Sequence, residues 1–127
     1  MSRQPIPEEG RPCGALHVGN AEDDGADYRG WFVGRFVKAD DARATEDVEV
    51  NWSLHPAGDR RPAWNPDETA TTLCLLVSGR FNLDFESQLV TLERPGDYAV
   101  WGPGIKHRWH ALQHSVVLTV RWPSPPF

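Results

Sequence analysis

The chain has 127 residues, of which 39% are hydrophobic, and a formal net charge of −5. This length predicts one domain with its own core, and the six tryptophans argue against global disorder. Lys and Arg are scattered along an acidic chain, so we expect no nucleic-acid partner. We also expect no membrane association, because no apolar run could span a bilayer. The first residues lack the hydrophobic stretch of a secretion signal, so we expect a cytoplasmic protein without a disulfide.

Residues 1–27 are rich in proline, glycine and acidic side chains, which predicts a partly extended N-terminal arm before a domain at 28–127. The aromatic and β-branched segment 30–38 predicts a strand with glycines at its bends. Residues 48–55 alternate, with Val48, Val50, Trp52 and Leu54 on one face. If that apolar face points inward, His55 points away from the interior.

The remainder of the chain predicts short strands at regular spacing. Prolines in the segment 59–69 predict a loop. The Ser78-Gly79 pair between two apolar runs predicts a two-residue hairpin turn. Many short strands with Gly/Pro turns and no segment of helical period predict an all-β sandwich or small barrel. The predicted strands are 71–77, 80–85, 88–93, 98–101, 107–112 and 115–122.

The segment 96–107 is the most informative part of the chain. It reads Gly-Asp-Tyr-Ala-Val-Trp-Gly-Pro-Gly-Ile-Lys-His. Glycine permits positive φ and proline fixes φ, so the turn at 102–104 sets the direction of the strand that begins with His107. An imidazole whose direction is fixed in this way is a candidate catalytic group or metal ligand.

This segment resembles the second sequence motif of the cupin superfamily. Gly96, Gly104 and His107 match that motif, while Gly102 replaces a proline and Ala111 an asparagine. The segment 73–81, with its glycine at 79, is similar to the end of the first cupin motif. The resemblance implies a cupin-like jelly-roll β-barrel, also called a double-stranded β-helix.

The same resemblance implies a divalent metal held by three histidines and one glutamate inside the barrel. His107 stands at the position of the second-motif ligand. Thr72 stands where the glutamate is expected, and the segment 64–68 contains no histidine. A divalent cofactor therefore stays possible, but the standard cupin ligand set is not present.

Other side chains could complete a reduced metal site around His107. Alternation puts Cys74 on the same face as Thr72, and thiolate, imidazole and carboxylate groups all bind first-row metals. The candidate partners are His55, Cys74, Asp67 and Glu68. Two of these candidates also have an ordinary structural explanation. A buried Cys74 would fill space in the core, and His55 would lie at a rim or a subunit contact.

A ligand pocket is the second possibility. His107 and Trp109 share one strand face, so the predicted ligand-binding residues are Trp64, Thr72, Cys74 and Trp109. Tryptophans are more often core residues than ligand contacts. Arg60, Arg61 and Arg80 lie near strand ends and could bind a carboxylate, although surface arginines commonly serve solubility.

We interpret the chain as a cupin-fold protein that binds a small molecule in its barrel, with catalysis open. The alternative is a metal-dependent oxygenase, isomerase or lyase in which His107 is a catalytic acid or base, or a metal ligand. The resemblance also implies a homodimer formed through edge strands. The aromatic segment 31–37 is the candidate contact, since an apolar edge needs covering.

Overall fold

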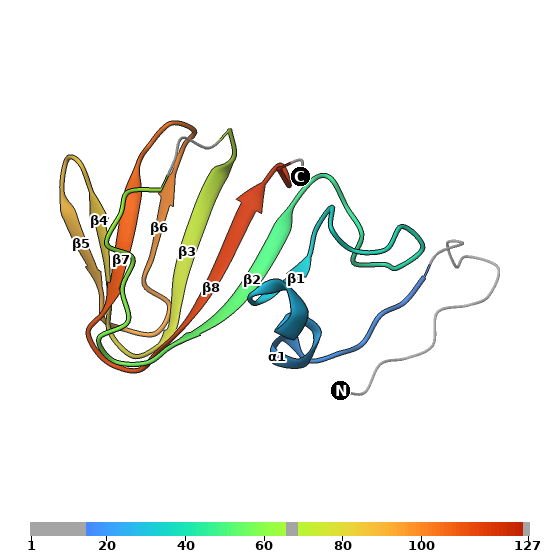
Figure 1. The fold of residues 1–127 in the computed structure, drawn as a ribbon, viewed down its shortest axis with the longest axis horizontal. Helices are drawn as coiled ribbons and strands as arrows, with labels where there is room; N and C mark the ends of the chain where they lie inside the picture. The colour runs from blue at the N-terminus through green and yellow to red at the C-terminus, as the bar shows by residue number, and fades with distance from the viewer. Residues whose placement is uncertain (1–14, 66–68, 126–127) are drawn as a thin grey trace.

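The computed structural model describes residues 15–65 and 69–125 and contains two antiparallel sheets (Figure 1). The larger sheet has the order β1-β2-β8-β3-β6, and the smaller has the order β5-β4-β7. This is an all-β jelly roll, as predicted. The strands are β1 (Trp31–Val33), β2 (Glu49–His55), β3 (Thr71–Ser78), β4 (Phe81–Phe85), β5 (Leu89–Leu92), β6 (Tyr98–Trp101), β7 (His107–Ala111) and β8 (Ser115–Trp122).

The hydrophobic core lies between the two sheets and follows from strand alternation. On β3, Thr72, Cys74 and Leu76 are buried, whereas their neighbours are partly exposed. On β7, His107 and Ala111 are buried, which confirms the predicted face of that strand. Apolar side chains on the inner faces of both sheets complete the core: Cys74, Leu76, Phe81, Leu83, Leu92, Trp101, Ala111 and Val117.

The predicted hairpin at Ser78-Gly79 is wrong. Strand β3 pairs with β6 and β8, whereas β4 pairs with β5 and β7, so the chain passes here from one sheet to the other. Gly79 has a φ of +97°, and a Cβ atom there would lie 2.3 Å from the carbonyl oxygen of His114. The glycine therefore marks a crossing between sheets, because only its bare Cα permits both the conformation and the close approach.

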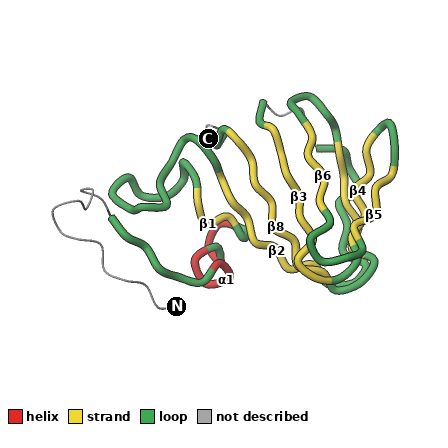
Figure 2. The backbone as a smooth tube through the Cα atoms, turned by 180° about the vertical axis from the view of Figure 1, so that it is seen from behind, coloured by secondary structure: helices red, strands yellow, loops and turns green. Residues whose placement is uncertain are grey.

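The predicted inward face of β2 is also wrong. Glu49 and Asn51 are buried, whereas Leu54 is 47% exposed. Alternation then places Ser53 and His55 on the inner face as well, where both line the interior cavity. By the same alternation, the apolar side chains of β2 lie on the outer face of the five-stranded sheet, in which β2, β8 and β3 run side by side (Figure 2).

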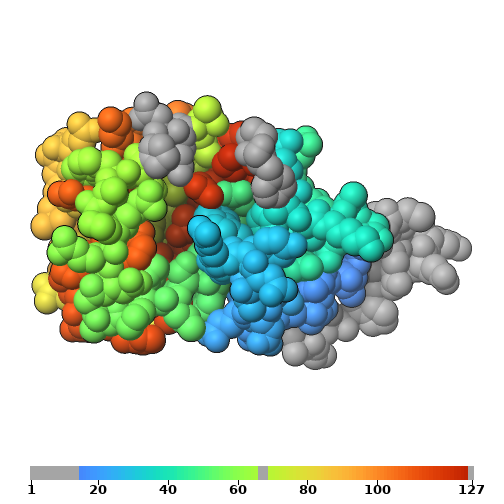
Figure 3. Space-filling view, in the orientation of Figure 1, coloured from blue at the N-terminus to red at the C-terminus, as the bar shows by residue number. Residues whose placement is uncertain are grey.

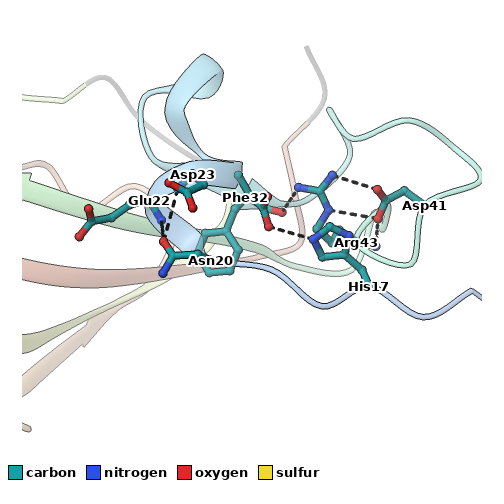
Figure 4. Close-up of polar contacts among 8 residues, drawn as sticks. His17, Asn20, Glu22, Asp23, Phe32, Asp41 and Arg43 are labelled. Atoms are coloured by element: carbon teal, nitrogen blue, oxygen red, sulfur yellow. Dashed lines mark hydrogen bonds and ion pairs between the residues drawn. The ribbon is translucent and has the colours of Figure 1, made fainter. Parts of the chain in front are cut away.

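Only Trp31–Val33 of the predicted strand 30–38 is extended. It pairs with β2 and is followed by a loop that side chains hold in place. Arg43 donates to both carboxylate oxygens of Asp41 and to the backbone oxygen of Phe32 (Figure 4). The Arg43 guanidinium lowers the pKa of Asp41 to about 2.

Two short helical turns precede β1. Asn20 caps the helix α1 (Ala21–Asp24) by accepting from the backbone N–H of Glu22, and the 3-10 turn η2 (Ala26–Tyr28) follows. No helix among residues 15–65 and 69–125 is long and apolar enough to cross a membrane. In the space-filling view, the N-terminal segment in blue and the loop after β2 in green flank the C-terminal strand in red (Figure 3).

Candidate functional site

A cavity of about 490 Å³ lies between the inner faces of the two sheets. One part of its wall is aromatic and is formed by Trp31, Phe81, Trp101 and Trp109. Another part is polar and includes Asn51, Ser53, Asn65, Thr72 and Thr119. A concave space in which aromatic side chains and converging polar groups meet is a candidate small-molecule site.

His107 lies at the start of β7, directly after the turn at 102–104. Pairing with Phe85 of β4 fixes the backbone, and the residue is only 8% exposed. The Nε2 atom of its ring lies 2.7 Å from Asn65 Nδ2, and the Asn65 backbone N–H donates to the His107 carbonyl at 2.8 Å. The Trp101 ring packs against the imidazole at a centroid distance of 4.6 Å. The imidazole is therefore held on two sides.

Two side chains that line the cavity each have a buried polar atom without a hydrogen-bond partner among the described residues. These atoms are Nδ1 of His107 and Oγ1 of Thr72. If the Asn65 amide donates to Nε2, the ring proton lies on Nδ1, which is then a free donor. An unpaired buried polar group costs about 1–3 kcal/mol, so these atoms favour occupation of the cavity by a polar partner.

The His107 imidazole is held in its neutral form. Burial, together with smaller contributions from the positive charges of Arg61 and Arg121, lowers its pKa to about 4. At neutral pH the ring therefore offers one donor and one acceptor.

We expect this pKa to make stability depend on pH. The folded pKa lies below that of the unfolded chain, so protons bind preferentially to the unfolded chain as pH falls. Between pH 6.5 and 4 the parent should lose roughly 3 kcal/mol of stability relative to His107→Gln, because each pKa unit corresponds to about 1.4 kcal/mol. Urea unfolding at several pH values measures this, and a difference independent of pH would contradict it.

A buried ion pair holds the part of the cavity wall that contains Arg121 and Trp31. Arg121 Nε donates to Glu49 Oε1 at 2.6 Å, and the Ser124 hydroxyl donates to the other carboxylate oxygen at 3.0 Å. The Arg121 guanidinium lies 4.2 Å from the ring centroid of Trp31. Glu49 thus orients an arginine and, through it, one aromatic wall of the cavity.

Replacing Glu49 with Gln should lower the free energy of unfolding by about 2–4 kcal/mol, since it leaves the Arg121 charge without its buried partner. Chemical denaturation measures the loss. Glu46→Gln is the matched control, because Glu46 pairs with Arg35 through a carboxylate that is 75% exposed. That variant should lose less than about 1 kcal/mol. Equal losses in the two variants would contradict the assignment of a structural role to the Glu49 pair.

His55 lies in the cavity wall, contrary to the prediction from strand alternation. Its Nδ1 atom lies 2.9 Å from a carboxylate oxygen of Asp59, and its ring packs against Trp109 at a centroid distance of 4.4 Å. The carboxylate orients the imidazole, as is common for functional histidines.

The structure brings together four of the five residues that were predicted as catalytic or ligand-binding. His107, Thr72, Cys74 and Trp109 all line the cavity. Trp64 is not among the lining residues of the cavity and instead packs against the Arg108 guanidinium at 4.3 Å.

The donors of the described residues do not fit a cupin-type metal. No group of three or more His, Cys, Asp or Glu side chains that could hold a metal ion is found within 15–65 and 69–125. Burial raises the pKa of the Cys74 thiol to about 12, which disfavours the thiolate that metals bind. Two predicted ligands, Asp67 and Glu68, lie outside the described residues.

Sequence reasoning missed several cavity residues. Asn51 and Ser53 were not predicted as cavity residues, because the apolar face of β2 was assumed to point inward. Arg121 lies near the end of the mostly apolar strand β8 and belongs to no motif, and Asn65 is joined to His107 across 42 positions. The polar alternation Glu49, Asn51, Ser53 and His55 is the signal that could have identified this face.

Comparison with solved structures identifies the class of fold. The structure of KdgF from Halomonas sp. matches with a TM-score of 0.58 and 23% identity, over 64% of this chain and 74% of that chain. A cupin-2 domain protein from Shewanella frigidimarina matches with a TM-score of 0.51 and 16% identity, over 60% and 71%. A salicylate 1,2-dioxygenase variant from Pseudoaminobacter salicylatoxidans has a TM-score of 0.56 and 13% identity, over 65% and 23%.

The chain therefore has the cupin fold, as the resemblance of segments 96–107 and 73–81 implied. No family model matches the sequence, and no curated protein is similar to it. The neighbours include a protein named as an enzyme, the salicylate 1,2-dioxygenase variant, and a protein of unknown function from Streptococcus pyogenes, and a fold does not by itself determine an activity.

Proposed function

We propose that the protein binds a small polar organic molecule in the interior of its barrel. The observation that carries this proposal is a pair of buried polar atoms without partners, His107 Nδ1 and Thr72 Oγ1, on two side chains that line one cavity. A ligand that hydrogen-bonds to both would remove their desolvation cost. Trp101 and Trp109 provide flat apolar surface on which the remainder of the ligand can pack.

A metal-dependent enzyme is the second candidate, and the cupin fold favours it because a salicylate 1,2-dioxygenase is among the structural neighbours. The side chains favour metal-independent binding instead, since Nε2 of His107 is already bonded to Asn65. Elemental analysis of untagged protein separates the two. We expect far less than one equivalent of Zn, Fe, Mn or Ni per chain, and one equivalent would overturn this preference.

Protein-observed NMR with a library of small polar compounds tests the binding proposal. We expect hits to shift the indole N–H signals of Trp101 and Trp109 and the side-chain amide of Asn65, which bonds to His107. Hits that shift only residues outside the cavity, or a library without hits in the cavity, would contradict it.

A further inference from the structure

We infer that the molecule bound in the cavity carries an oxyanion, either a carboxylate or a phosphate, which Arg29 and Arg61 bind at the cavity mouth. This inference rests on the proposed function and names the chemical class of the ligand. The guanidinium group presents parallel N–H donors that match either oxyanion.

The charge of the cavity is opposite to that of the chain. The whole sequence has 18 acidic and 13 basic residues. The described cavity wall contains three arginines, at positions 29, 61 and 121, and no Asp or Glu. Walls of one charge in a site of low dielectric attract ligands of the opposite charge.

The three arginines differ in what neutralises them. Arg121 is paired with Glu49 and packs against Trp31. Arg29 and Arg61 have no ion pair within the part of the chain that the structure describes. Two positive charges at one cavity are therefore left for a ligand.

The backbone places both of these arginines at the cavity. Arg29 has a φ of +56°, a left-handed conformation that is uncommon outside glycine. The Arg61 backbone N–H donates to the Trp109 carbonyl at 3.0 Å, which ties its loop to the cavity strand β7. The positive charge of Arg61 also acts on the interior of the cavity, where it contributes to the lowered pKa of His107.

Arg60 is a natural control for Arg61. It is adjacent in sequence and also exposed, but it bridges to His110 and lines a separate surface hollow instead of the cavity. Replacing either arginine with Gln removes one positive charge from the same loop. Only the Arg61 substitution should change the charge at the cavity.

Three matched probes test the inference: benzoate, phenyl phosphate and the neutral benzamide. By NMR titration, benzoate or phenyl phosphate should bind in the cavity at least ~10-fold more tightly than benzamide, a difference of about 1.4 kcal/mol. Arg61→Gln should remove most of this preference, and Arg60→Gln should retain it. Added salt should weaken binding of the charged probes, because the arginines lie at the exposed mouth. The stronger of the two anions then identifies the oxyanion.

The outcomes separate this inference from the proposed function. Benzamide binding in the cavity as tightly as both anions would overturn the inference and leave small-molecule binding intact. Equal loss of anion preference in the Arg60 and Arg61 variants would also overturn it. No shift at Trp101 or Trp109 with any probe or library compound would overturn the proposed function itself.

Discussion

Replacing His107 with Gln should abolish binding of the compounds that occupy the cavity, with an affinity loss of at least ~10-fold. Gln is similar in size and can still bond to Asn65, so the fold should persist and the free energy of unfolding at neutral pH should change by less than about 1.5 kcal/mol. Gln has no equivalent of the second ring nitrogen, Nδ1, which is the buried atom without a partner. Titration by NMR or calorimetry measures the affinity.

His110→Gln is the matched control for this experiment. His110 lies on the same strand, is opposite Asn82 and lines a surface hollow instead of the cavity. This variant should bind ligands as the parent does. If His107→Gln also binds as tightly as the parent, the role of His107 is structural, and the binding site must depend on other cavity residues.

Gly79→Ala should lower the free energy of unfolding by about 3 kcal/mol or more, as measured by urea denaturation. The new methyl group would be strained by the φ of +97° and would approach the His114 carbonyl oxygen to 2.3 Å and the Ser115 hydroxyl to 2.5 Å. The Ser115 hydroxyl accepts from the Arg80 backbone N–H at the same crossing between sheets. The substitution therefore affects the point that joins the two sheets.

Gly96→Ala separates the backbone strain at Gly79 from the close approach of the new methyl group to its neighbours. Gly96 has nearly the same φ, +96°, but a Cβ atom there would have no neighbour within 4 Å. Its substitution should cost only the backbone strain, about 1 kcal/mol. An equal loss at positions 79 and 96 would show that the close approach at Gly79 contributes nothing.

The fold class and most strand positions could be predicted from the sequence, because both depend on local patterns. Short alternating runs and Gly/Pro turns specify strands wherever they occur. The segment 98–101 and the segment 115–122 were predicted at the bounds that the structure has. The turn at 102–104 followed from the same local chemistry, whereas the resemblance to the second cupin motif implied that His107 is an interior residue, as it is in the structure.

Tertiary structure alone decided which residues meet around His107. Alternation on β2 separates an apolar face from a polar face, but it does not say which of them points inward. Here the neighbours β8 and β3 supply an apolar outer face, and the polar side chains of β2 face the cavity. Asn65 and Arg121 likewise reach the site through pairings that no local pattern encodes, because contacts between distant segments depend on how the two sheets pack.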